Sequence, residues 1–226
     1  MSVREEFDEW AAEGRDRGME ERHWHTAKHA LARMAIEEGD TVLDMGCGSG
    51  YAARAMREAG GAGQAYGLDG SPAMVRNASA YTDDANTGFL VGDFEHLPFE
   101  SDSVDHVFSM EAFYYASDPM AALEEVRRIL RPGGTFYCAV DFHADNPHTA
   151  EWTEYVDIEM TRWSRKEYRE RFREAGFYVV EQDTIPDREV EIPPADEFPT
   201  EDWETREAMV EHFREHGTLL TVGVAP

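Results

Sequence analysis

Residues 42–50 read VLDMGCGSG, and this stretch decides the fold class. The apolar residues before Asp44 predict the end of a strand, and the alanine-rich residues 51–59 predict a helix. Between them lie three glycines at alternate positions: Gly46, Gly48 and Gly50. Because glycine has no Cβ, the backbone can come close to a ligand here, and free amides at the helix start would face it. The stretch therefore predicts a ligand-binding turn between a strand and a helix.

The spacing of the glycines separates two classes of nucleotide-binding protein. Dinucleotide-binding folds carry G-x-G-x-x-G, whereas this chain has G-x-G-x-G, with Tyr51 where the last glycine would stand. An acidic residue ahead of G-x-G-x-G resembles the first motif of the class I S-adenosylmethionine-dependent methyltransferases. For the glycine loop taken alone, a purely structural turn remains the alternative.

Two acidic residues further along the chain extend this resemblance. Residues 65–69 predict a second strand that ends at Asp69, whose carboxylate could accept two hydrogen bonds from a ribose diol. A third strand, 88–92, leads into Asp93 and Phe94, and residues 91–99 (VGDFEHLPF) resemble the adenine-binding loop of the same family. In that loop an aspartate accepts a hydrogen bond from the adenine amino group.

The remaining core elements follow in the order that this family shows. We expect a strand at 103–109, an amphipathic helix at 123–130 and a strand at 135–140, with LRPGG between the last two. The matching segments cover about residues 40–141 and are most similar to the group that includes quinone-biosynthesis methyltransferases, which act mostly on small molecules. The resemblance implies a Rossmann-like, doubly wound α/β fold. Its seven-stranded sheet would be mostly parallel, with an antiparallel last strand and helices on both faces.

The resemblance also implies the cofactor, S-adenosyl-L-methionine, which leaves as S-adenosyl-L-homocysteine. The residues expected to bind it are Asp44, Gly46, Cys47, Gly48, Gly50, Asp69, Gly70, Met74, Gly92, Asp93, Phe94 and Met110. Gly70 departs from the family pattern, because the residue after the ribose-binding acid is often a larger apolar side chain that stacks on adenine. Tyr66, Met74 or Phe94 could cover the adenine instead.

The rest of the chain extends this core at both ends. We expect a helical cap at 1–38 and a methyltransferase domain at 39–226, together forming one structural domain. Acceptor-side insertions are expected at about 142–162 and 185–216. Outside the core we expect a helix after Ser164 closed by a capping box with Glu167, a sixth strand from Tyr178, a helix at 203–216 and a final strand at 217–224.

The composition indicates a folded protein from a high-salt cytoplasm. The chain carries 47 acidic against 21 basic residues, a formal net charge of −26, while 42% of its residues are hydrophobic. At about 1 M salt the screening length is only ~3 Å, so repulsion among surface carboxylates is weak. At low salt the same charge should destabilise the compact state. Proteins that bind nucleic acid need basic patches, so we expect no nucleic-acid partner.

Other features bear on where the protein is located. No apolar run approaches the roughly 20 residues that cross a bilayer, and the first residues lack the pattern of a signal peptide. The two cysteines, Cys47 and Cys138, are not expected to pair and suit a reducing interior. We therefore expect a cytoplasmic protein without a membrane span.

Transfer from a sulfonium requires mainly that the acceptor be held in line with the methyl group. Positioning alone can contribute roughly 7–11 kcal/mol, and a base is needed only if the acceptor must lose a proton. Acceptor groups should follow the carboxyl ends of strands. The expected catalytic candidates are His143, His148 and Glu111, and the expected substrate-binding residues are Trp24, His25, Tyr114 and Tyr115.

Three functions remain open at this stage. The first is a small-molecule methyltransferase, the second a non-catalytic S-adenosylmethionine-binding subunit or sensor, and the third an NAD-dependent oxidoreductase on a related sheet. A metal site is not expected. His25 and His29 form an i, i+4 pair, but no third ligand is suitably spaced.

Overall fold

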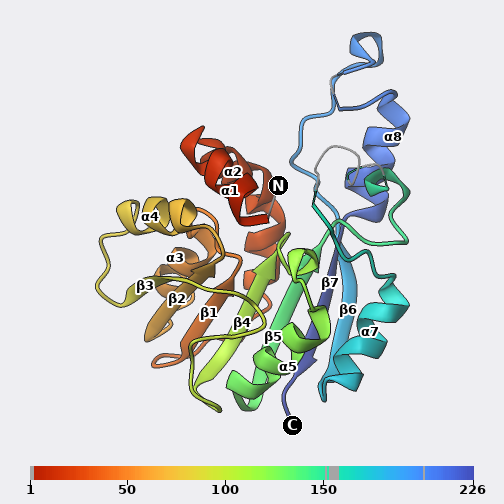
Figure 1. Ribbon diagram of the computed structural model, residues 1–226. Helices are drawn as coiled ribbons and strands as arrows, with labels where there is room; N and C mark the ends of the chain where they lie inside the picture. The colour runs from red at the N-terminus through yellow and green to blue at the C-terminus, as the bar shows by residue number, and fades with distance from the viewer. Residues whose placement is uncertain (1–2, 151, 153–157, 201) are drawn as a thin grey trace.

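The computed structural model describes residues 3–150, 152, 158–200 and 202–226 of the chain. Its centre is a seven-stranded sheet in the order β3-β2-β1-β4-β5-β7-β6. Every neighbouring pair is parallel except those that β7 makes with β5 and β6. The predicted doubly wound α/β sheet with an antiparallel last strand is therefore confirmed (Figure 1).

The elements alternate along the chain as the sequence pattern predicts. The strands are β1 (Thr41–Met45), β2 (Gln64–Asp69), β3 (Thr87–Val91), β4 (Val104–Met110), β5 (Leu130–Val140), β6 (Tyr178–Ile185) and β7 (Thr218–Val224). The main helices are α1 (Val3–Ala12), α2 (Arg15–Leu31), α3 (Tyr51–Glu58), α4 (Pro72–Ala80), α5 (Pro119–Ile129), α7 (Arg165–Glu174) and α8 (Arg206–Val210). Short 3₁₀ helices are η1 (Phe113–Tyr115), η2 (Pro147–Thr149) and η3 (Ala195–Glu197), and a π-helix, η4 (Glu211–His216), continues α8.

Two apolar clusters cover the two faces of the sheet, because successive strand side chains point to opposite faces. Leu43 of β1 packs in the cluster that contains the buried residues of α5 and α7, such as Leu123 and Phe172. Its neighbour Val42 packs in the other cluster, with Ala30 of α2 and other alanine and methionine side chains of α2 and α3. The second half of α2 is thus part of the main core, while α1 lies above the carboxyl ends of the strands (Figure 1).

Several element boundaries follow from local side-chain chemistry. The Ser71 hydroxyl accepts a hydrogen bond from the Met74 amide and begins α4 with a proline in its first turn. Ser164 and Glu167 form the predicted capping box at the start of α7.

Several boundaries differ from the expectation, and α5 begins four residues earlier than expected, at Pro119. The helix predicted from residue 203 begins at Arg206, because Thr205 caps it by accepting from the Ala208 amide. The LRPGG segment does not separate helix from strand: β5 already begins at Leu130, which pairs with Val104 of β4. Of the expected insertion at 142–162, residues 151 and 153–157 lie outside the described residues.

The strand order reverses between β1 and β4, which are neighbours in space although β2 and β3 lie between them in the sequence. At such a point the loops after two adjacent strands turn to opposite faces and leave a crevice, where open α/β sheets bind ligands. In this protein α1 and the first half of α2 lie above that crevice (Figure 1). The topology therefore places a candidate site beneath the N-terminal helices.

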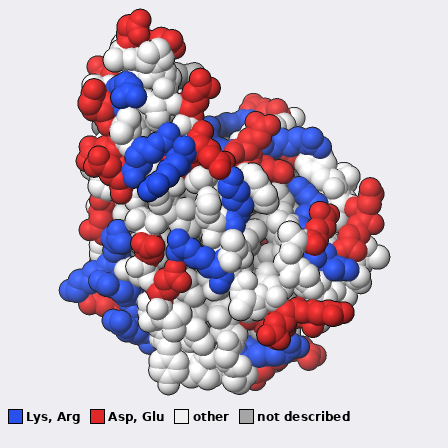
Figure 2. Space-filling view, turned by 180° about the vertical axis from the view of Figure 1, so that it is seen from behind, with Lys and Arg blue, Asp and Glu red and all other residues white. Residues whose placement is uncertain are grey.

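Basic side chains stand among acidic ones on the face shown in Figure 2. Arg33 lies 2.5 Å from Glu181, and Lys28 lies 2.6 Å from Glu189. Since the chain has 47 acids and only 21 bases, such pairing can offset less than half of its negative charge.

Candidate functional site

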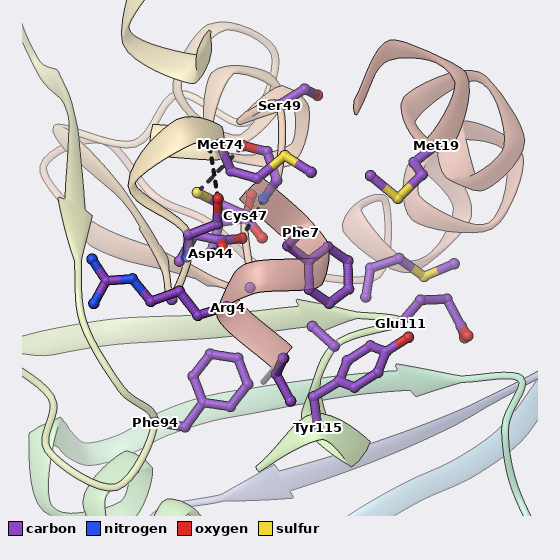
Figure 3. Close-up of a pocket in the computed structure, with 18 of the residues that line it drawn as sticks. Arg4, Phe7, Met19, Asp44, Cys47, Ser49, Met74, Phe94, Glu111 and Tyr115 are labelled. Carbon is purple, nitrogen blue, oxygen red and sulfur yellow. Dashed lines mark hydrogen bonds between the residues drawn. The ribbon is translucent and has the colours of Figure 1, made fainter. Parts of the chain in front are cut away.

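A cavity of about 350 Å³ opens at the carboxyl ends of β1, β2 and β4 (Figure 3). Its lining comes from five parts of the chain: the glycine loop, the ends of β2 and β3, the start of α4, the segment after β4, and helices α1 and α2. The residues predicted to bind cofactor that line it are Asp44, Gly46, Cys47, Gly48, Asp69, Gly70, Met74, Gly92, Asp93, Phe94 and Met110. Cavities of this size suit small molecules.

Hydrogen bonds within the protein fold the glycine loop tightly. The amides of Gly46 and Cys47 both donate to the Leu68 carbonyl, at 2.8 and 3.1 Å, and the Gly50 amide donates to the Cys47 carbonyl. The Gly48 amide donates to Asp69 Oδ2 at 2.9 Å. These four loop amides therefore have protein acceptors and are not free to bind a ligand.

Gly46 and Gly50 are required for space, and all three glycines of the loop have the positive φ angles that favour glycine. A Cβ at Gly46 would overlap the Cβ of Ala112, and a Cβ at Gly50 would overlap the Phe89 ring. A Cβ at Gly48 would meet no heavy atom of the described residues within 4 Å, and it would stand at the cavity wall. Gly50 does not line the cavity; with φ of 79° it turns the chain into α3 and packs against β3.

Asp69 connects the glycine loop to the start of α4. While Oδ2 accepts from the Gly48 amide, Oδ1 accepts from the Ser71 amide, also at 2.9 Å. Burial raises the pKa of Asp69 above its usual value, and these two hydrogen bonds act against that rise. A Cβ at the following residue, Gly70, would again meet open space. The carboxylate is thus held in a fixed orientation at the cavity wall.

Asp44 is almost fully buried beneath the loop. It is 2% exposed, and its Oδ2 accepts from the Ala53 amide in the first turn of α3 at 3.2 Å. Burial raises its pKa to about 7. The carboxyl group therefore sits between strand and helix and is partly protonated near neutral pH.

The segment after β4 supplies a second acidic group to the cavity wall. Glu111 has a positive φ of 50°, and one of its oxygens accepts from the Tyr114 hydroxyl at 3.0 Å. The other accepts from the Asp141 backbone amide. Burial, followed by the charge of Asp141, raises the pKa of Glu111 well above its usual range. This predicted candidate does line the cavity, and its carboxyl group is fixed by two neighbours.

The N-terminal helices are attached to the site by polar contacts from α1 and α2. Asp8 Oδ1 accepts from the Ser71 hydroxyl at 2.6 Å and from the Ala73 amide at 3.0 Å, so α1 is joined to the start of α4. Glu20 of α2 accepts from the Ser49 hydroxyl of the glycine loop at 2.8 Å. The two helices therefore contact the loop and the helix that bound the cavity.

These helices also place side chains in the cavity that the sequence did not single out as site residues. Phe7 of α1 contacts the Tyr115 ring edge-on, with ring centroids 5.2 Å apart. Met19 of α2 projects into the same cavity (Figure 3). His23 lines the same space, and burial lowers its pKa to about 4, so the imidazole is neutral at pH 7. The spacing of Phe7, Trp10 and Ala11 on one helical face was the available signal, but it does not reveal what that face covers.

Several predicted residues lie away from the cavity. Trp24 is 42% exposed and meets the Tyr51 ring edge-on at 6.2 Å. His25 Nε2 lies 3.2 Å from the Pro186 carbonyl oxygen, so it joins α2 to a distant loop. Tyr114 is buried behind Tyr115, with ring centroids 4.5 Å apart. Of the four expected substrate-binding residues, Tyr115 is the one that lines the cavity among those described.

The two histidines expected as bases are also elsewhere. His143 is 2% exposed, and neither of its ring nitrogens makes a hydrogen bond to the described residues. Burial lowers its pKa to about 4. His148 lies near Glu211 of the π-helix, at 3.5 Å. Both follow β5 as predicted, but the chain turns away from the crevice there.

Comparison with known proteins identifies the family. Residues 43–138 match the family described as a methyltransferase domain. A solved complex pairs the Haloferax volcanii Trm112 methyltransferase activator with a chain described as a methyltransferase. That chain is 68% identical to this one, with full coverage of both and a TM-score of 0.97. This protein belongs to the class I S-adenosylmethionine-dependent methyltransferases. The relation to a Haloferax protein also supports the expected high-salt origin.

More distant methyltransferase relatives share the fold or part of the sequence. The sterol 24-C-methyltransferase of Schizosaccharomyces pombe is 30% identical over 177 residues, 72% of this chain and 46% of that one. The chain thus spans about half the length of the sterol methyltransferases it matches. A Haemonchus contortus phosphoethanolamine N-methyltransferase, solved with phosphomonomethylethanolamine and S-adenosylhomocysteine, gives a TM-score of 0.69 at 20% identity, covering 90% of this chain and 53% of that one. S-adenosylmethionine is accordingly the cofactor of this methyltransferase.

Within the described residues, no helix has the length and apolar character needed to cross a membrane.

Proposed function

We propose that this methyltransferase transfers the methyl group of S-adenosylmethionine to a small-molecule acceptor in the crevice between β1 and β4. The observation that carries the proposal is the cavity itself. One wall holds a glycine with open space in front of it and two aspartates, and the other holds aromatic and thioether side chains under the N-terminal helices. The first wall suits a nucleoside, and the second suits an apolar or flat acceptor.

The cofactor fits the groups on the first wall. Open space at Gly48 and Gly70 leaves room that a side chain would fill. Asp69 is held by two amides, and its remaining acceptor capacity suits the two hydroxyls of a ribose. Asp93 and Phe94 line the neighbouring part of the cavity, where they would hold the adenine ring. Phe94 and Met74 offer apolar surface in place of the side chain that Gly70 lacks.

The second wall would hold the acceptor. When bound, the cofactor supplies an activated methyl group on a sulfonium, so the protein must chiefly orient the acceptor and exclude water. Phe7, Met19 and Tyr115 provide the apolar surface for this. If the acceptor must lose a proton, His23 is the group that we propose to receive it, since its neutral imidazole lines the cavity. Glu111 also lines the cavity, but its raised pKa favours the protonated form, which cannot accept a proton. Neither His143 nor His148 lines the cavity.

The non-catalytic alternative differs from this proposal at the acceptor wall. A sensor or carrier subunit needs the nucleoside wall alone, whereas an enzyme also needs space for a second molecule. The cavity extends from Asp69 to Glu111 and Tyr115, which favours an enzyme. The oxidoreductase alternative is disfavoured by the G-x-G-x-G spacing.

A protein partner is also part of the proposal. The close Haloferax relative was solved with the Trm112 methyltransferase activator, and we propose that this chain pairs with an activator of the same kind. We further propose that it works in the cytoplasm, which its two free, buried cysteines suit.

The test combines binding and turnover. Calorimetry should show saturable binding of S-adenosylhomocysteine and no binding of NAD at the same concentrations. The protein, with and without the activator, is then incubated with methyl-labelled cofactor and either the small-molecule or the macromolecular fraction of a cell extract. Label in the small-molecule fraction supports the proposal. Label confined to macromolecules, or binding of NAD alone, would refute it.

A further inference from the structure

Three potential metal ligands meet on the side of the molecule where the chain leaves β5. They are His148 in η2, and Glu211 and His216 in the π-helix, and their ligand atoms all lie within 4.8 Å of one another. None of them lines the cofactor cavity. We propose that these three side chains bind a divalent transition-metal ion, with zinc as the ion whose chemistry they match.

The distances around Glu211 are those that a shared ion would produce, and the contact with His216 also meets the geometry of a long hydrogen bond. Its two carboxylate oxygens lie 3.5 Å from His148 Nε2 and 3.4 Å from His216 Nε2. Strong N–H···O bonds are shorter, at about 2.7–3.2 Å. Two ligands bound to one zinc ion at about 2.0–2.1 Å, at a tetrahedral angle, are separated by roughly 3.3 Å. Each imidazole therefore stands at about that distance from one of the two carboxylate oxygens, and an ion would draw the three ligand atoms, now within 4.8 Å of one another, slightly closer.

The His148 ring has an unsatisfied nitrogen in this cluster. Its Nε2 atom is shielded from solvent and makes no hydrogen bond with the described residues. Buried polar atoms normally have a partner. A metal ion held between His148 and Glu211 would provide that partner, whereas an apolar contact would not.

The backbone of this region brings the ligands together. In an α-helix, side chains five residues apart, such as Glu211 and His216, would point about 140° apart. The π-helical turn from Glu211 to His216 follows an i→i+5 pattern instead, and so sets both on one side. Asn146 orients the third ligand, since its side-chain oxygen accepts from the His148 amide at 3.1 Å. Rare π-helical turns often occur at functional sites.

The ligand set selects the class of ion. Two imidazoles and one carboxylate suit zinc and its neighbours, whereas magnesium and calcium prefer oxygen ligands alone. Two histidines and one acid also leave a fourth position open for water. The strongly negative chain raises the local concentration of any cation.

An ion at this place would join two acceptor-side segments and approach the cofactor cavity. His148 belongs to the segment after β5, while Glu211 and His216 belong to the segment before β7. His212 lies between Glu211 and His216 in the sequence of the π-helix, and its Nε2 is 3.4 Å from a carboxylate oxygen of Asp141. The Asp141 backbone amide in turn donates to Glu111 at the cavity wall. The inference does not depend on the methyltransferase proposal, because metal binding is measured without turnover.

The test measures zinc binding to the whole chain after chelator treatment, in a salt concentration that keeps it folded. We expect saturable 1:1 binding by calorimetry that excess magnesium does not displace. Cobalt should give a visible absorption band of comparable stoichiometry. Loss of a residue that only hydrogen-bonds a metal ligand typically weakens metal binding about 10- to 100-fold. His148→Gln and Glu211→Gln each remove a direct ligand and should weaken zinc binding by more than that. Zinc should also raise the melting temperature of the wild type, but not of His148→Gln.

The matched control is His29→Gln, which removes an exposed histidine from the i, i+4 pair with His25. It should bind zinc as tightly as the wild type does. Circular dichroism verifies that each variant is folded, and the exposed Glu211 side chain makes Glu211→Gln the safest of them. Unchanged affinity in folded Glu211→Gln, or an equal loss in His29→Gln, would overturn the proposal, as would displacement of zinc by magnesium.

Discussion

Removing the Asp69 carboxylate should weaken cofactor binding while leaving the protein folded. In the wild type the Gly48 and Ser71 amides each donate to the Asp69 carboxylate at 2.9 Å. In Asp69→Ala both amides lose this acceptor. Both amides border the cavity, because both residues line it, so water can reach them in the variant. The ribose of the cofactor would lose its proposed partner at the same time.

The two effects are similar in free energy but differ in their consequence. A hydrogen bond to a charged group contributes about 1.5–3 kcal/mol, so loss of the ribose contact should weaken S-adenosylhomocysteine binding roughly 10- to 150-fold. In the variant the Gly48 and Ser71 amides would donate to water in place of the carboxylate. This change should lower the free energy of unfolding by about 1–3 kcal/mol in total. Because small domains are stable by about 5–15 kcal/mol, the variant should remain folded.

Calorimetry gives the affinity, and denaturant unfolding gives the stability. Asp183→Ala is the control, because it removes the same charge from an exposed position on β6 that lies outside the cavity. Its affinity should equal that of the wild type. If folded Asp69→Ala bound the nucleoside as tightly as the wild type did, the carboxylate would have no role in cofactor binding and the reasoning would be refuted.

Three further predictions test other parts of the site. Gly48→Val should abolish cofactor binding, because its side chain would enter the open cavity, and circular dichroism must verify its fold, since the φ of 48° strains a β-branched residue; unchanged calorimetric affinity would make the loop a structural turn only. Asp8→Ala removes the contacts between α1 and the start of α4, so steady-state assays should show a raised KM for the acceptor; a fall in kcat alone would contradict a role for α1 in covering the site. Burial raises the pKa of Asp44 to about 7 in the folded state, above the ~3.9 of an unperturbed aspartate. The folded protein therefore binds the extra proton between about pH 4 and 7, and its stability should fall by up to about 1.4 kcal/mol per pH unit as pH rises through that window. Asp44→Asn should lose this component, and identical pH slopes of the unfolding free energy in variant and wild type would refute it.

Local chemistry explains why so much of the fold could be predicted from the sequence. The glycine loop requires backbone conformations and close approaches that glycine alone allows, as Gly46 shows against Ala112. Ser71 and Ser164 begin their helices by bonding to amides three residues ahead, which depends on neighbours in the chain. Alternating apolar residues set the strands, and ligands bind where parallel strands end. The positions of Asp44, Asp69 and Asp93 at strand ends were therefore enough to predict that they line the cavity.

The acceptor side was decided by long-range packing. Phe7 and His23 come to the cavity because α1 packs against α4 and α2 packs against α3, β5 and β6, all distant in the sequence, and no local pattern encodes that position. His143 and His148 follow β5 in sequence, yet their segment packs against the π-helix instead of the crevice. The His148–Glu211–His216 cluster depends on one π-helical turn and on a contact between segments over sixty residues apart. Side-chain periodicity determines which residues face inward, but only the complete packing determines which distant segments meet there.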